Sequence, residues 1–134
     1  MAELQVQVMT PAKVVVKTPA HLVELPGAQG YMGILPGHTR MISELSAGTL
    51  TVATGQGQQV YFISGGYVDV NQDRVTVLAD AAEKPVDIDV ARAAAAKARA
   101  LGRLTEGVAV DIARAQASLV RAEHRLVLAM RQGA

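Results

Sequence analysis

The residues that interrupt regular structure are confined to one part of this sequence. All five prolines lie at or before Pro85, and nine of the twelve glycines lie in the same segment. After Pro85 the chain is rich in Ala, Arg and Leu, which are strong helix formers. Proline and glycine separate short strands and are unfavourable inside helices. The sequence therefore predicts two domains of different class, residues 1–84 and residues 85–134.

Residues 1–84 are expected to form an antiparallel β-sandwich. Leu4–Val8 alternates apolar and polar side chains, which is the period of a half-buried strand. Gly55–Gly57 and Asn71–Asp73 have the composition of hairpin turns. Many short strands with frequent turns favour a sandwich, and the absence of strand–helix alternation argues against a parallel nucleotide-binding sheet. Further strands are expected at Val14–Val16, Leu22–Leu25, Thr49–Ala53, Gln59–Ser64, Tyr67–Val70 and Arg74–Leu78.

The composition also predicts what fills the core. Half of the residues are hydrophobic, but the aromatic residues number only four, three Tyr and one Phe. We therefore expect a core of Val, Ile, Leu, Met and Ala.

Residues 85–134 are expected to form an antiparallel two-helix hairpin. Asp87 or Asp89 can cap the first helix, which we expect over residues 90–101. A break is expected at residues 103–106, between Gly102 and Gly107, and a second helix is expected to reach about Met130. Because alanine permits close approach but buries little surface, the hairpin should detach at modest cost. The predicted packing stripe is Ile112, Ala115, Leu119, Ala122, Leu126 and Ala129.

Charge follows the same division. Residues 1–87 carry five basic and eight acidic side chains, whereas residues 88–134 carry eight basic and four acidic ones, so the net charges are −3 and +4. The chain has no cysteine, which fits a reducing compartment. The start of the chain lacks the basic and apolar blocks of a signal peptide, and no apolar run approaches the ~18 residues that span a bilayer. We expect a soluble chain that reaches a membrane only through partners.

The stretch GYMGILPGHTRMISEL, residues 30–45, raises the question of what His38 does. A catalytic or metal-binding histidine needs a nucleophile, carboxylate or metal partner nearby, and none is suggested by the spacing of His21 and His124. The glycine spacing differs from that of phosphate-binding loops, so tight turns are the better interpretation. His38 is then a polar loop residue or a contact for a partner protein.

Six arginines form two repeats of the same spacing. Arg92, Arg99 and Arg103 are seven and then four residues apart, and the second helix repeats this spacing with Arg114, Arg121 and Arg125. At about 3.6 residues per turn, each set forms one stripe along its helix. Two stripes brought together would bind phosphate or carboxylate, whereas separate stripes would be solvated faces.

Four blocks of this sequence resemble the epsilon subunit of bacterial and chloroplast-type F-type ATP synthase, which is named delta in mitochondria. The blocks occur in the order and at the spacing of that family, and the resemblance covers essentially the whole chain. They are Gly33–His38 (GILPGH), Gly48–Leu50 (GTL), Ile63–Val70 (ISGGYVDV) and Val75–Asp80 (VTVLAD).

The resemblance implies an N-terminal β-sandwich, a C-terminal helical hairpin and a place in the rotor of a proton-translocating motor. The implied partners are the gamma subunit, the ring of c subunits and the alpha and beta subunits, which hold the catalytic sites. The chain itself would not be an enzyme and would require no cofactor and no metal. It would be a peripheral protein on the cytoplasmic face of the bacterial inner membrane. The hairpin would inhibit ATP hydrolysis when extended along gamma and permit rotation when folded down.

In this family the loop that contains His38 faces the c-ring. The resemblance implies that the contact residues here are Tyr31, Met32, Leu35, His38 and Arg40. The chain departs from the family pattern at two places: an acidic residue is common where Tyr31 stands, and Ala-Pro is common where Thr39-Arg40 stands. Tyr31 retains contact area without charge, and Arg40 adds a positive charge nearby.

Ile88–Ala93 (IDVARA) resembles the I-D-x-x-R-A signature of members that bind regulatory ATP. The implied ATP site comprises Glu83, Ile88, Asp89, Arg92, Ala93, Arg99, Arg121 and Arg125. When the hairpin extends, Arg114, Arg121 and Arg125 would instead face an acidic loop of the beta subunit. ATP and the beta subunit would then compete for the same arginines.

Three other functions remain to be tested. A stand-alone ligand-binding β-sandwich with a basic helical tail would be a functional monomer without gamma. A nucleic-acid-binding module would use the arginine helices, but the acidic sandwich and the lack of stacked aromatic residues argue against it. An enzyme would need a catalytic constellation, which the sequence does not suggest.

Overall fold

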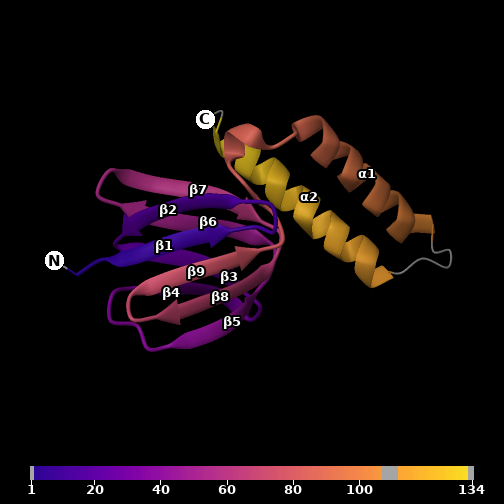
Figure 1. Cartoon of the computed structure of the whole chain (residues 1–134). Helices are drawn as coiled ribbons and strands as arrows, with labels where there is room; N and C mark the ends of the chain where they lie inside the picture. The colour runs from indigo at the N-terminus through magenta and orange to yellow at the C-terminus, as the bar shows by residue number, and fades with distance from the viewer. Residues whose placement is uncertain (1, 107–111, 133–134) are drawn as a thin grey trace. The chain divides into compact units, whose positions relative to one another are not determined.

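The computed structural model describes residues 2–106 and 112–132. The chain divides into two compact units, Met1–Glu83 and Lys84–Ala134 (Figure 1). The first unit contains the strands, and the second contains the helices.

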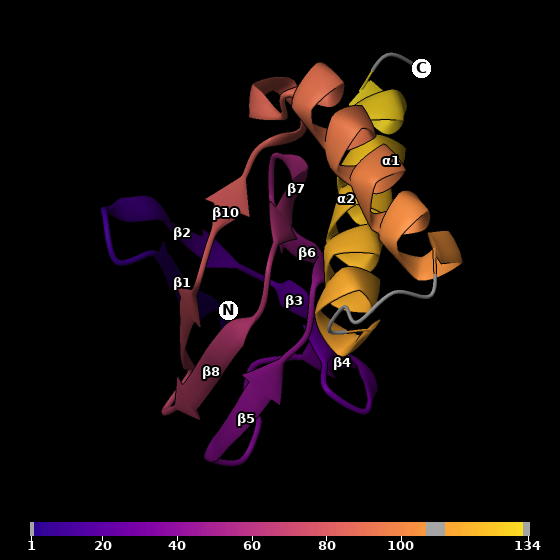
Figure 2. The same ribbon diagram turned by 90° about the vertical axis from the view of Figure 1, so that its right-hand side faces the viewer.

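The first unit is a β-sandwich, as predicted. Its strands are β1 Leu4–Met9, β2 Val14–Ala20, β3 Leu22–Gly27, β4 Gly30–Ile34, β5 Met41–Leu45, β6 Gly48–Thr54, β7 Gly57–Ile63, β8 Gly66–Asn71, β9 Arg74–Ala79 and β10 Ala82–Glu83. Their order is β10-β7-β6-β3-β5-β8-β9-β1-β2, and β4 pairs with β3. A single residue pair, Gly27 with Leu45, joins β3 to β5. The sheet therefore splits into two layers, which Figure 2 shows edge on.

One strand pair departs from the expected antiparallel pattern. β1 and β9 are parallel, with Val6 opposite Val75 and Val8 opposite Val77, whereas the other pairs of described strands are antiparallel. Parallel neighbours need a long connection, which strands β2 to β8 supply here. Alternation within a strand predicts which face is buried but not the direction of a distant partner.

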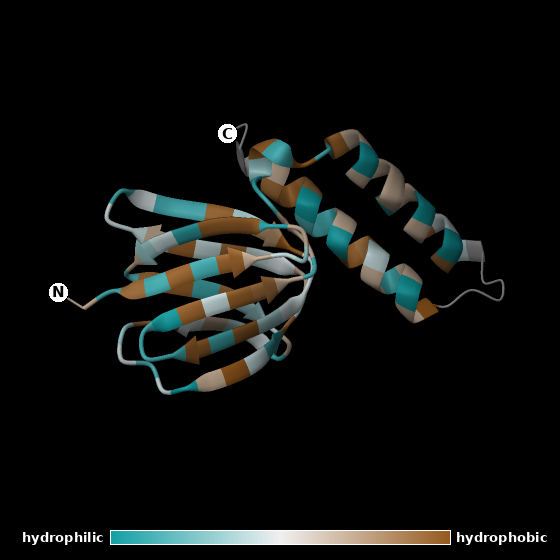
Figure 3. Ribbon diagram, viewed as in Figure 1, coloured by the Kyte–Doolittle hydropathy of each residue, from teal (hydrophilic) through white to brown (hydrophobic). Residues whose placement is uncertain are grey.

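The core lies between the two layers and is mainly aliphatic. Buried and more exposed residues alternate along strands such as β1, β8 and β9, and Figure 3 shows bands of hydrophobic and hydrophilic residues along the ribbon. Val6 and Val75 from one layer and Leu50 from the other are at most 1% exposed. Each such side chain stabilises the fold by about 1.5–3 kcal/mol. The expectation of a core built only from Val, Ile, Leu, Met and Ala was incomplete, because Tyr61 also belongs to this core and is 3% exposed.

The second unit is a helical hairpin. A short 3-10 helix, η1 Pro85–Asp87, precedes α1 Val90–Glu106 and α2 Ile112–Gln132. The predicted break at residues 103–106 was wrong, because α1 continues through Gly102 and the hydroxyl of Thr105 donates to the carbonyl of Leu101 at 2.7 Å. One glycine costs a helix only about 1 kcal/mol, which the surrounding helix formers offset. Gly107, the other predicted boundary, lies outside the described residues.

Asp89 starts the first helix. Its carboxylate accepts a hydrogen bond of 3.0 Å from the amide of Arg92, and its carbonyl accepts one of 2.9 Å from the amide of Ala93. Of the two predicted caps, Asp89 is thus the residue that satisfies a free amide of the first turn. Asp87 belongs to η1 instead.

Alanine lines the interior of the hairpin. Ala93 and Ala100 of α1 and Ala115 and Ala122 of α2 are at most 3% exposed. Their seven-residue spacing places each pair on one helix face. Ile112, which was predicted to begin the packing stripe, is 60% exposed. Neither of the described helices is long and apolar enough to span a membrane.

Candidate functional site

The loop between β4 and β5 is built around a tight turn. The amide of His38 donates to the carbonyl of Leu35 at 3.2 Å, and Gly37 has a φ of 85°. A type II turn needs a positive φ at its third position, which glycine adopts readily, and proline is common at its second position. Leu35-Pro36-Gly37-His38 has both residues, so the local sequence favours this geometry. Leu35 projects outward and is 59% exposed.

His38 is held within this loop. Its Nδ1 atom lies 2.7 Å from the carbonyl oxygen of Thr39, so Nδ1 carries the proton that it donates. Among the described residues, no group of three or more His, Cys, Asp or Glu side chains could hold a metal ion. The bond to Thr39 holds the imidazole of His38 against its own loop.

The loop is also bonded to a distant turn. The amide of Gly37 donates a hydrogen bond of 2.7 Å to Oδ1 of Asp73, which lies in the turn between β8 and β9. The carbonyl of Asp73 in turn accepts a bond of 2.8 Å from the amide of Gln5, the second residue of β1. Sequence reasoning missed Asp73, because the two bonded residues are 36 positions apart.

Tyr31 lies at the other end of β4. Its ring is 59% exposed, and its hydroxyl oxygen accepts a bond of 3.1 Å from the amide of Thr49. The side chain passes over Gly48, where an added Cβ would lie 2.8 Å from the Tyr31 hydroxyl. Tyr31 therefore presents a fixed ring with its hydroxyl turned toward β6.

The five predicted c-ring contacts are thus not one compact cluster. Tyr31 and Met32 lie in β4, whereas Leu35, His38 and Arg40 lie in the following loop. Met32 is half-buried and packs against the sandwich core. The exposed members are Tyr31, Leu35 and Arg40, with His38 half-buried between the last two. They follow the edge of the sandwich along β4, because β4 pairs with β3 alone among the described strands.

Six arginines of the two helices lie on one side of the hairpin. On α1, Arg92 and Arg99 each precede a buried alanine by one residue, and so do Arg114 and Arg121 on α2. One residue is a rotation of about 100° in the same sense on both helices. Because the helices are antiparallel, equal rotations away from the interface lead to the same side. We name this the arginine face: Arg92, Arg99, Arg103, Arg114, Arg121 and Arg125.

The arginine face suits an anion with several oxygens, since guanidinium groups form paired hydrogen bonds with phosphate and carboxylate. Arg121 donates from Nη2 to the hydroxyl of Ser118 at 3.1 Å, which orients its side chain along α2. Arg92, Arg99 and Arg103 are exposed, and Arg121 and Arg125 are half-buried.

Most residues of the I-D-x-x-R-A signature have structural roles at the start of α1. Ile88 is 7% exposed and Ala93 is 3% exposed, so both side chains belong to the interior. Asp89 uses a carboxylate oxygen to cap the helix. Arg92 alone among the four sends a long side chain outward. Glu83, the remaining predicted ATP contact, lies in β10 of the first unit.

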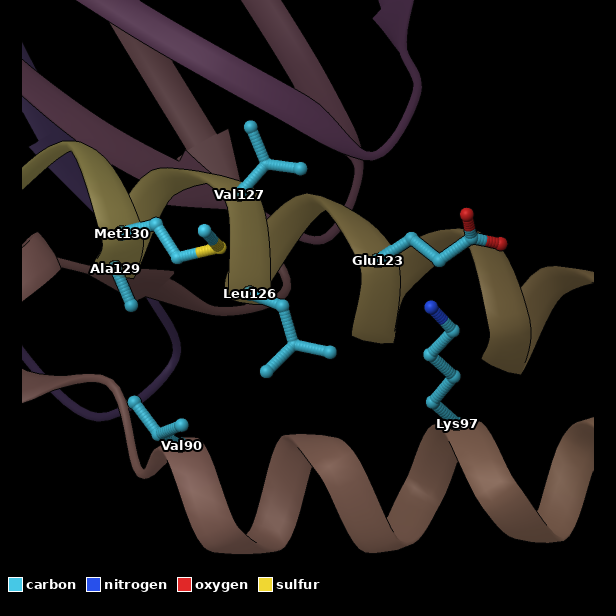
Figure 4. A pocket seen from close by; sticks show the side chains of 7 residues that line it. All are labelled: Val90, Lys97, Glu123, Leu126, Val127, Ala129 and Met130. Carbon is cyan, nitrogen blue, oxygen red and sulfur yellow. The ribbon is translucent and has the colours of Figure 1, made fainter.

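The opposite side of the hairpin holds a groove that sequence reasoning missed. It has a volume of about 380 Å³ and lies between α1 and α2 (Figure 4). Leu126 points toward α1, and Lys97 and Glu123 point toward one another across the groove. The rest of the lining is apolar: Val90, Val127, Ala129 and Met130. A helical-wheel projection could have indicated this groove, because its apolar residues lie opposite the arginines on both helices.

Comparison with known proteins covers both units. The family model for the β-sandwich domain of the ATP synthase delta/epsilon chain matches residues 3–85, and the model for the long α-helix domain of that chain matches residues 87–129. An ATP synthase epsilon chain of Koribacter versatilis is 48% identical over 99 residues, which are 73% of this chain and 69% of the relative. One from Anoxybacillus flavithermus is 42% identical over 104 residues, 78% of each chain.

Solved structures show the same fold. A chain of the Euglena gracilis mitochondrial ATP synthase, solved as an OSCP/F1/c-ring assembly, superposes with a TM-score of 0.71 at 24% identity, covering 94% of this chain and 76% of that one. A chain of the central stalk/c-ring part of the Tetrahymena thermophila mitochondrial ATP synthase superposes with a TM-score of 0.62 at 11% identity, covering 98% of this chain and 96% of that one.

Proposed function

The chain belongs to the delta/epsilon subunit family of ATP synthases, and we propose that it is the epsilon subunit in the rotor of a proton-translocating F-type ATP synthase. The observation that carries this proposal is the match of both family domains, in order, to residues 3–85 and 87–129. The two structural neighbours come from assemblies described as F1/c-ring and central stalk/c-ring. The partners would be the gamma subunit, the c-ring and the alpha and beta subunits.

In this role the chain is a coupling element and not a catalyst. The sandwich binds gamma and the c-ring and transmits torque between proton flow and nucleotide chemistry. The chain associates with the membrane through the complex, on the cytoplasmic face of the bacterial inner membrane. It requires no cofactor.

The exposed edge formed by Tyr31, Leu35, His38 and Arg40 is the proposed contact for the c-ring. A docking surface must resist deformation under torque, and this one is made of a strand and a loop that are bonded to the rest of the sandwich. The type II turn at residues 35–38, the Gly37–Asp73 bond and the Tyr31–Thr49 bond support it. Because Arg40 is exposed, the contact favours an acidic or polar loop of the partner.

The helical hairpin is the proposed regulatory element. The arginine face offers one anion site that two ligands could use: the phosphates of ATP, or acidic side chains of the beta subunit. ATP would stabilise the folded hairpin, and the beta subunit would stabilise an extended, inhibitory one. Such competition changes the free-energy difference between the two states by the difference in binding free energy, and the population ratio changes exponentially with it.

Reconstitution tests the assignment to the rotor. A bacterial ATP synthase that lacks its epsilon subunit would be supplemented with this chain, and ATP-driven proton pumping would be measured in proteoliposomes. We expect the chain to co-purify with gamma and to restore pumping. Failure to bind gamma, with a stable monomer in solution, would instead support the stand-alone ligand-binding sandwich.

Calorimetric titration tests the regulatory ligand. ATP, with and without Mg²⁺, would be added to the full chain and to Arg92→Ala. The matched control is Lys97→Ala, which removes one positive charge from the opposite side of the hairpin. Saturable binding that is lost in Arg92→Ala and kept in Lys97→Ala is the expected result. Absence of binding at millimolar ATP would leave the beta subunit as the ligand of the arginine face.

A further inference from the structure

The turn between β8 and β9 contains an unusual choice of residues. Its two central positions, Gln72 and Asp73, have φ angles of 51° and 62°. Positive φ at both positions is the requirement of a type I′ hairpin turn, for which Asn-Gly is the favoured pair. Glycine adopts this conformation without strain, whereas other residues incur a steric cost. Asp73 therefore occupies a position where glycine would suit the local backbone better.

The carboxylate of Asp73 forms a hydrogen bond that a glycine could not form. Oδ1 lies 2.7 Å from the amide nitrogen of Gly37, a length typical of a hydrogen bond to a charged acceptor. A glycine at position 73 would keep the hairpin and lose this bond. Aspartate at position 73 is thus less favourable than glycine for the β8–β9 turn, but of the two only aspartate can bond to the β4–β5 loop.

The bonded amide is the one that decides the geometry of that loop. In the turn Leu35–His38, the closing bond uses the amide of His38, and the amide of Gly37 belongs to the central peptide. Type I and type II turns differ by a flip of this central peptide. An acceptor placed at the Gly37 amide favours one of the two orientations. Asp73 therefore stabilises the type II form that Pro36 and Gly37 already favour, with Gly37 at a φ of 85°.

We propose that Asp73 is a positioning residue for the Leu35–Arg40 loop: its carboxylate holds the Pro36–Gly37 peptide in the type II orientation and so fixes the loop for its partner. Asp73 acts through Gly37 and need not touch the partner itself. This inference rests on the proposed function, in which the loop contacts the c-ring. It adds a determinant that lies outside the loop, at the tip of a different hairpin.

Three substitutions separate this role from a structural one. Asp73→Gly removes the acceptor but relieves the backbone, so the thermal unfolding midpoint should stay the same or rise. Asp73→Ala removes the acceptor without that relief. Asp73→Asn keeps an Oδ1 acceptor and should rescue the loop. Asp69→Ala, on the exposed face of β8, is the control for loss of one negative charge.

The loop is monitored directly by NMR of the full chain. In a type II turn the Pro36 Hα atom lies close to the Gly37 amide proton, and in a type I turn it does not. We expect this contact to weaken, and exchange of the Gly37 amide to speed up, in Asp73→Gly and Asp73→Ala but not in Asp73→Asn or Asp69→Ala. An unchanged Gly37 amide in Asp73→Gly would overturn the proposal.

Binding to purified c-rings is then measured for each variant in complex with gamma. Loss of one exposed charge-assisted hydrogen bond should weaken binding about 2- to 5-fold in Asp73→Gly and Asp73→Ala. Full binding by Asp73→Gly would overturn the positioning role. The double variant Leu35→Ala/Arg40→Ala tests the underlying contact. If it also binds fully, the proposed contact itself is wrong, which distinguishes the two failures.

Discussion

The hydroxyl oxygen of Tyr31 accepts a hydrogen bond of 3.1 Å from the backbone amide of Thr49. This bond fixes an exposed aromatic ring over the first residue of β6, and it directs the polar end of the side chain toward the backbone of that strand.

Tyr31→Phe tests the value of this bond. Removal of the hydroxyl leaves the Thr49 amide to water, so the free energy of unfolding should fall by about 0.5–1 kcal/mol. Tyr67→Phe, which alters a tyrosine that is 56% exposed on β8, is the matched control in urea unfolding. Equal stabilities of the two variants would show that the bond contributes nothing. Gly48→Ala should displace the ring, because the new Cβ would lie 2.8 Å from the hydroxyl.

Asp89→Ala should destabilise the start of α1. The carboxylate caps the amide of Arg92 at 3.0 Å, and loss of such a cap costs about 0.5–2 kcal/mol. Asp89→Asn keeps an acceptor and should lose less. Thermal melting followed by circular dichroism measures the effect, and Asp87→Ala in η1 is the control. A larger effect of Asp87→Ala would contradict the assignment of the cap.

The double variant Arg121→Ala/Arg125→Ala should relieve inhibition of ATP hydrolysis in a reconstituted complex. Exposed ion pairs contribute about 0.2–1 kcal/mol each, so two pairs would change the inhibited population roughly 2- to 30-fold. The rate of ATP hydrolysis is the measurement, and Lys97→Ala is the control for charge on the opposite side of the hairpin. Unchanged inhibition in the double variant would rule out the arginine face as the inhibitory contact.

Because of Tyr61, the free energy of unfolding should decrease at alkaline pH. Burial raises the pKa of its phenol above the ordinary value of 10.0, and the hydroxyl donates to Oε1 of Gln59 at 3.0 Å. Above pH 10 the unfolded chain releases this proton before the folded chain does. The stabilisation is therefore complete below pH 10 and is lost as the pH rises through the folded-state pKa.

Tyr61→Phe should remove that part of the alkaline decline. At neutral pH the free energy of unfolding of the variant should be lower by about 0.5–1.5 kcal/mol, the net contribution of one hydrogen bond. Urea unfolding between pH 8 and about 11, compared with Tyr67→Phe, measures both effects. An alkaline decline in Tyr61→Phe as steep as in the unaltered chain would show that another group is responsible.

Gly66→Ala should prevent correct folding of the sandwich, whereas Gly30→Ala should be tolerated. Both glycines have a similar φ, 134° and 130°. A Cβ on Gly66 would strike the carbonyl oxygen of Leu78 and lie 2.9 Å from Cα of Ala79, but one on Gly30 has nothing within 4 Å. Gly30→Ala should therefore cost only backbone strain, about 1–3 kcal/mol. Equal losses in soluble expression and unfolding midpoint would show that strain dominates over the clash.

Much of the architecture was predictable from local pattern. The confinement of proline to the first part of the chain and the alternation in β1 predicted strands followed by helices. The turn at Gln72-Asp73 and the cap at Asp89 follow from rules that involve neighbouring residues only. The strand β4, with two glycines among its five residues, was not predicted, because its stability comes from pairing with β3 and not from its own propensity.

The sequence by itself determined the class of each domain, the tight turn at Leu35–His38 and the spacing of the arginines, since these depend on backbone preferences and helical periodicity over a few residues. Tertiary structure alone decided that β1 lies parallel to β9, that Asp73 meets Gly37 and that Tyr31 is bonded to Thr49. Such contacts join segments that are far apart in the chain. Their geometry depends on how whole strands pack around a shared core, which no local pattern specifies.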